Sequence, residues 1–152
     1  MKCADRTVME RESQGREVSA NAAQGTIEFP AGLLGFEEVK RYQLLGSPEE
    51  APFLWLQMVE EPRLAFLVVS PAMIMENYHP DISAEDVQFL GLEQSQDAMV
   101  FNIVTMHKDG SVTVNLKGPI VVNRQTLIGK QVIPVNSGEF DLQYRLSVVK
   151  AA

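Results

Sequence analysis

Short runs of apolar residues, each bounded by turn-forming residues, follow one another along most of the chain. From Gln24 onward these runs are rich in Val, Ile, Leu and Phe, and Gly, Pro, Asn or Asp separates most of them, which is typical of short β-strands. The runs that predict strands are 26–29, 42–45, 53–58, 64–69, 99–106, 111–116, 120–123 and 127–134. The segment 140–149 fits either a final strand or mixed structure.

Two local signals add a hairpin and a helix to this pattern. Asp109-Gly110 lies between two of the runs and supplies the positive φ angles that a tight hairpin turn needs. Residues 83–90 predict a short helix, because Ser83 can cap the N-terminus and Asp86 stands three positions later, as in a capping box.

These elements predict a mostly β protein: a compact, barrel-like antiparallel fold of short strands with one or two short helices. The 152 residues suit one domain, which we place at residues 25–150. Residues 1–24 are rich in Arg, Glu, Ser, Gln and Ala and show little apolar periodicity, so they predict a flexible N-terminal tail.

The composition narrows the class of protein further. No run approaches the ~20 apolar residues of a membrane helix, and the N-terminus lacks the apolar stretch of a secretory signal. We therefore expect a cytoplasmic protein that does not bind the membrane. Cys3 is the single cysteine, and His79 and His107 lie far apart in sequence, so we expect no metal site and no cofactor.

Charge is spread unevenly along the chain, whose formal net charge is -7. Residues 28–97 hold thirteen acids and three bases, whereas residues 98–152 hold three acids and six bases. An acidic first half argues against nucleic acid as a direct ligand, since phosphates must be met by Lys and Arg. It fits a basic partner, although an acidic surface can also serve solubility alone.

No motif predicts catalysis. General acid–base work needs carboxyl groups held at a fixed separation across a cleft, and adjacent acids in loops do not provide this. The segment 32–35, Gly-Leu-Leu-Gly, matches neither a P-loop nor a dinucleotide-binding fingerprint, and Gly-x-Ser-x-Gly is absent. We therefore expect a protein that is not an enzyme.

Four ordered segments resemble the FliW family of flagellar assembly factors. The segment 29–37, FPAGLLGFE, is similar to the opening motif of that family. Similar segments follow at 52–57 with 64–71, at 78–82, and at 114–123 with 126–133. The last reads NLKGPIVVN and then T..GKQVI, with Gly118 where the family usually has alanine. Each segment alone is unspecific, but the order and spacing across 25–146 are specific.

The resemblance implies a binding function and two protein partners. Proteins of this family bind flagellin in the cytoplasm, and they bind CsrA, a small RNA-binding translational repressor. The two compete, so that export of flagellin frees the factor to capture CsrA and relieve repression of flagellin translation. The inhibition of CsrA is allosteric in the family.

On this basis, we expect acids in loops or on the helix to rim a CsrA-binding face. The candidate acids are Glu49, Glu50, Glu60, Glu61, Glu85 and Asp86. In the signature segment we expect Ile120 and Val122 to be core residues. Asn115, Lys117 and Asn123 either present polar groups on an exposed strand face or have structural roles, and the sequence leaves this open.

Two alternatives remain beside a monomeric regulator that binds both partners. One is a flagellin chaperone that makes no contact with CsrA. The other is a small β-barrel enzyme or small-molecule carrier, which needs a deep pocket with convergent polar groups.

Overall fold

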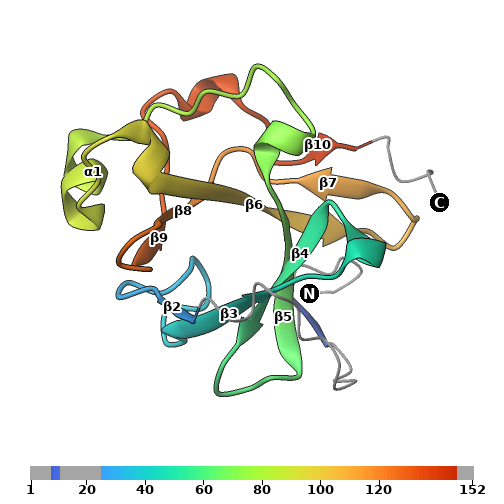
Figure 1. Ribbon diagram of the computed structural model, residues 1–152. Helices are drawn as coiled ribbons and strands as arrows, with labels where there is room; N and C mark the ends of the chain where they lie inside the picture. The colour runs from blue at the N-terminus through green and yellow to red at the C-terminus, as the bar shows by residue number, and fades with distance from the viewer. Residues whose placement is uncertain (1–7, 11–24, 147–152) are drawn as a thin grey trace.

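Antiparallel strands form nearly all of the regular structure in the computed structural model, which describes residues 8–10 and 25–146 (Figure 1). The strands are β1 (Val8–Glu10), β2 (Thr26–Glu28), β3 (Arg41–Leu45), β4 (Phe53–Met58), β5 (Leu64–Val69), β6 (Ala98–Met106), β7 (Val112–Val114), β8 (Ile120–Asn123), β9 (Gly129–Gln131) and β10 (Tyr144–Arg145). The α-helix is α1 (Ala84–Leu90), and short 3-10 turns are η2 (Pro48–Glu50), η3 (Pro71–Met73), η4 (Ser95–Asp97) and η5 (Ser137–Glu139).

Strand pairing follows the order β10-β7-β6-β5-β4-β3-β2, and β8 and β9 branch from β6. The long strand β6 pairs with β8 along its first four residues and with β7 along its last three. Each named strand pair is antiparallel. The predicted mostly β, antiparallel fold with a short helix is therefore confirmed.

The predicted closure into a barrel stays a prediction. β2 and the residue before β9 meet at one isolated parallel bridge, Glu28–Ile128, where the Glu28 amide donates to the carbonyl of Leu127 at 2.9 Å. One bridge brings the two edges together, but it is not a ladder of paired strands.

Buried apolar side chains form one main core cluster between the strands. The main cluster joins buried residues from β2 to β6 and from β8, and its aromatic rings meet edge to face. Phe29 and Tyr42 lie 5.4 Å apart between ring centroids, and Phe36 and Phe66 lie 5.3 Å apart. Ile120 and Val122 are fully buried in this cluster, which confirms their assignment to the core.

The motif at 29–37 has a structural reason for its first glycine. Gly32 has φ +73°, and a Cβ there would lie 2.4 Å from the Glu37 Cα. Only glycine accommodates both the positive φ and the close approach of the returning backbone. The motif is thus a tight loop that packs on the core.

The helix forms as its sequence predicts. The Ser83 hydroxyl accepts a hydrogen bond from the Asp86 amide at 3.1 Å, and Gly91 ends the helix with φ 70°. Leu90 packs with Val121 of β8 and with Val132. Figure 1 shows α1 on the β8–β9 side, away from β7 and β10.

Differences from the expected elements lie in the N-terminal tail and in the last third of the chain. Within the expected tail 1–24, residues Val8–Glu10 form β1, which pairs with Leu64–Phe66 of β5; the remainder of the tail lies outside the described residues, and its flexibility stays a prediction. The run 127–134 forms a strand only at Gly129–Gln131. In the undecided segment 140–149, Tyr144–Arg145 is a strand against β7, and residues beyond 146 lie outside the described part.

Across the described residues, no helix is both long enough and apolar enough to span a bilayer.

Candidate functional site

The first pair of candidate acids lies on η2, just before β4. Glu49 and Glu50 are exposed, and the Glu50 Oε1 accepts a hydrogen bond from the half-buried Trp55 indole at 3.1 Å. The indole orients one carboxylate of the pair, while both side chains stay at the surface. This end of β4 therefore presents two negative charges beside a partly exposed aromatic ring.

The second pair, Glu60 and Glu61, lies in the turn that follows β4. Both are exposed, and Glu60 forms an ion pair with Arg41 of β3, with hydrogen bonds from both Nε and Nη2. The hydrogen bond to Glu60 and its charge raise the pKa of Arg41. Glu61 forms no such ion pair among the described residues, so one of the two carboxylates in this turn is paired with a cation and the other is not.

The helix acids have different environments. Glu85 is exposed in the first turn of α1, where the helix dipole favours a negative charge. Asp86 is only 8% exposed and forms an ion pair with Lys130 of β9. Asp86 differs from Glu85 because adjacent residues on a helix point in different directions. The prediction that Asp86 rims a partner face is therefore corrected, since its carboxylate holds α1 against β9.

The exposed acids do not converge on one small face. Glu50 and Glu60 lie beyond opposite ends of β4, whose six residues span roughly 20 Å. Glu85 belongs to α1, on the β8–β9 side of the molecule. The exposed candidate acids thus occupy three separate positions on the surface.

The polar residues of the signature segment have structural roles. Asn123 is 5% exposed; its amide donates to the Leu90 carbonyl at 2.8 Å and its oxygen accepts from the Gln125 amide at 2.8 Å. Asn115 accepts from the amides of Lys117 and Gly118, which shapes the turn between β7 and β8. The reading in which these side chains form an exposed polar face is therefore wrong for Asn123 and unsupported for Asn115.

Lys117 is also engaged within the fold. Its ammonium donates to the Ser137 carbonyl at 2.9 Å and the residue is half-buried. It therefore ties the turn after β7 to η5.

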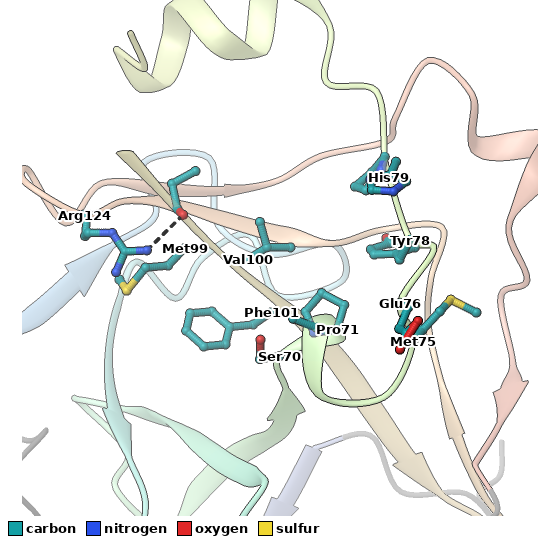
Figure 2. A pocket seen from close by; sticks show the side chains of 13 residues that line it. Ser70, Pro71, Met75, Glu76, Tyr78, His79, Met99, Val100, Phe101 and Arg124 are labelled. Atoms are coloured by element: carbon teal, nitrogen blue, oxygen red, sulfur yellow. Dashed lines mark hydrogen bonds between the residues drawn. The ribbon is translucent and has the colours of Figure 1, made fainter. Parts of the chain in front are cut away.

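A surface groove of about 690 Å³ lies where β5 and β6 diverge (Figure 2). Its lining comes from the start of β6, from the segment after β5, and from Arg124 after β8. Figure 2 shows Arg124 beside Met99 at one end of the groove, with Tyr78 and His79 at the other. No sequence pattern predicts this groove, because its walls come from segments that are distant in the chain.

The described residues hold no grouping of acids, His or Cys able to bind a metal. His79 is exposed beside the groove, and His107 bonds the buried Thr113 hydroxyl through Nε2 at 2.7 Å. His79 lies in the loop before α1 and His107 follows β6, so the two histidines do not form a shared site.

The antiparallel sheet, the apolar core and the single short helix define a small, mostly β domain. A family model described as "FliW protein" matches residues 10–146. The chain therefore belongs to the FliW family of flagellar assembly factors. These factors are not enzymes, so the prediction of a non-catalytic protein is confirmed by the family.

Curated relatives and a solved structure agree with this assignment. A flagellar assembly factor FliW of Leptospira biflexa is 44% identical over 109 residues, which are 70% of this chain and 71% of the relative. Another, from Borrelia turicatae, is 38% identical over 120 residues, 78% of this chain and 90% of the relative. A crystal structure of the flagellar assembly factor FliW superposes with a TM-score of 0.74 at 29% identity, over 95% of this chain and 99% of the other.

Proposed function

We propose that this flagellar assembly factor binds flagellin and the translational regulator CsrA, and that it antagonises CsrA repression of flagellin translation by switching between the two partners. The switch is allosteric: the factor occupies CsrA away from the RNA-contacting surface. The protein acts in the cytoplasm and is monomeric when free. The observation that carries the proposal is membership of the FliW family, and the exposed acids on the surface support it.

The charge of the surface gives the proposal a physical basis. A protein that grips RNA must carry basic residues to meet phosphate. An acidic surface attracts such a protein and repels its RNA, which favours the regulator over the nucleic acid. Among the candidate acids, Glu49 and Glu50 fit this role best, because both are exposed and neither is paired with a cation in the described residues.

The experiment is charge reversal of one acidic position at a time, measured as binding to purified CsrA at low salt. The variants are Glu49→Lys with Glu50→Lys, Glu60→Lys with Glu61→Lys, and Glu85→Lys. We expect the first to slow association by about tenfold and the effect to fade at high salt, because exposed charges act mainly on encounter. Glu93→Lys, also at an exposed position, is the matched control.

Because the three positions are well separated, the scan also locates the binding face. Loss of binding in one variant alone places CsrA at that position. If each variant bound CsrA with unchanged kinetics at low salt, the electrostatic basis of the proposal would be wrong.

The second candidate function, a flagellin chaperone without CsrA contact, predicts a different result. Such a protein binds purified flagellin and does not retain CsrA in a pull-down with both partners present. The small-ligand alternative is disfavoured, since it needs a deep pocket with polar groups, whereas apolar side chains pack the main cluster between the strands.

A further inference from the structure

The groove between β5 and β6 contains a short length of unpaired strand edge. β5 pairs with β6 at three positions, the last being Val69 opposite Asn102. Earlier in β6, residues Ala98–Phe101 pair with β8 on one side. On the other side, no strand in the described residues pairs with them.

The register fixes which main-chain groups face the groove. In an antiparallel pair, alternate residues direct both their N–H and C=O to the same neighbour. The carbonyls of Asp97 and Ile103 accept from the Arg124 and Asn115 amides, on the β8 and β7 side of β6. The main-chain N–H and C=O groups of the odd-numbered β6 residues therefore point toward β7 and β8. Those of Val100 point to the opposite side, into the groove.

The segment after β5 does not satisfy these groups. Continuing the register of β5 would place Pro71 opposite Val100, and proline has no N–H to donate. The chain turns away into η3, where the Met73 amide bonds the Ser70 carbonyl and the Met75 amide bonds the Pro71 carbonyl. The amides of Met73, Ile74 and Met75 are thus used within this turn.

Arg124 adds a positive charge at one end of the exposed edge. Its Nε donates to the Gln96 carbonyl at 3.1 Å and one Nη donates to the Ala98 carbonyl at 3.3 Å, which holds the guanidinium in place (Figure 2). It forms no ion pair with the acids of the described part of the chain. A guanidinium has five donors, so others remain for a carboxylate.

We propose that this groove is a docking site for an extended segment of a partner protein, which pairs its main chain with Val100 and places an acidic side chain on Arg124. This is strand addition at an open sheet edge, in which main-chain hydrogen bonds supply affinity and a neighbouring side chain supplies selectivity. The segment carries an acidic side chain at Arg124, whereas the partner expected at Glu49 and Glu50 is basic. The site is therefore separate from the surface of the proposed function and does not depend on it.

The first test is hydrogen exchange of the free, full-length protein by NMR. The amides of Met99 and Phe101, which face β8, are expected to exchange at least about tenfold more slowly than the Val100 amide. Equal protection of all three amides would overturn the proposal, because it would mean that Val100 is already paired. Protection of Val100 that rises with protein concentration would also overturn it, since the edge would then be an interface between copies.

The second test uses a capped peptide of alternating Val and Thr with one central Asp. Its titration is expected to slow exchange at Val100 and to shift resonances around the groove. The same peptide N-methylated at alternate residues, so that the pairing edge is blocked, is expected to bind about tenfold more weakly. Equal binding of the methylated peptide, or no response at millimolar peptide, would contradict strand addition.

A double-mutant cycle tests the contact between the peptide Asp and Arg124. Asp→Asn in the peptide is expected to weaken binding to the natural chain by about tenfold and to have little effect on the Arg124→Gln variant. Equal loss in both proteins would show that Arg124 does not receive the carboxylate. None of these outcomes depends on CsrA or flagellin, so failure here is distinct from failure of the proposed function.

Discussion

Two buried tyrosines differ in what their hydroxyl groups contact. The Tyr78 hydroxyl donates to the Leu116 carbonyl at 2.7 Å and accepts from the Asn102 amide at 3.2 Å. The Tyr42 hydroxyl is buried in the main cluster without a hydrogen-bond partner among the described residues. Tyr78→Phe is expected to lower the free energy of unfolding by about 1–2 kcal/mol, whereas Tyr42→Phe leaves it equal or higher. Urea unfolding of both variants measures the contrast, and an equal loss in both would contradict it.

Burial of Tyr42 also predicts a pH dependence. Burial raises the pKa of Tyr42 well above the ordinary value of 10.0. The unfolded chain then loses this proton near pH 10 while the folded chain keeps it, so the free energy of unfolding decreases as the pH rises above about 10. Urea titrations between neutral and alkaline pH are expected to show a shallower decrease in Tyr42→Phe than in the natural chain. Equal slopes would mean that Tyr42 ionises as easily in the fold as outside it.

Asn123 shows why polar residues in the signature segment were hard to assign from sequence. Its side chain binds the end of α1 and the turn before β9, two elements whose meeting only the tertiary structure reveals. Asn123→Ala is expected to lower the free energy of unfolding by about 1–3 kcal/mol, because it leaves buried main-chain groups unpaired. Asn77→Ala, at an exposed position, is the matched control and should change it by less than about 0.5 kcal/mol. A similar small effect at both positions would contradict the structural role.

At the scale of elements, β9 packs so closely against Phe29 and β8 that its first residue has no room for a side chain. A Cβ on Gly129 would lie 2.6 Å from Cε1 of Phe29 and 3.0 Å from Cγ2 of Val122. Gly129→Ala is therefore expected to cost about 1–3 kcal/mol of unfolding free energy. Gly138→Ala, where a Cβ meets nothing within 4 Å, is the control. Equal stability of the two variants would show that this part of the core has space to spare.

The sequence predicted elements well where an apolar run was bounded by turn residues. The strands at Phe53–Met58 and Leu64–Val69 and the helix capped by Ser83 agree with the structure in their bounds, because local signals define both ends. β1 was missed because its only reason to be a strand is pairing with β5, more than fifty residues away. The run 127–134 was too long because apolar residues after Gln131 continue beyond the pairing with β8.

At the scale of the whole molecule, the sequence predicts how much charge there is but not where it lies. The sequence makes both Glu85 and Asp86 candidates for a partner face, yet Glu85 is exposed while Asp86 is buried against Lys130. The two exposed pairs were expected on one face, yet β4 separates them. The groove at Arg124 and Val100 had no signal at all, because an unpaired edge appears only when the register of three strands is known.

The central claim is that this chain works by occupying one protein partner and releasing it to another. The most direct measurement is the binding of fluorescently labelled CsrA to the purified full-length protein, with purified flagellin added as competitor. The account predicts saturable binding of CsrA and complete release as flagellin is added. Binding of flagellin with no affinity for CsrA, or simultaneous binding of both without mutual displacement, would contradict it.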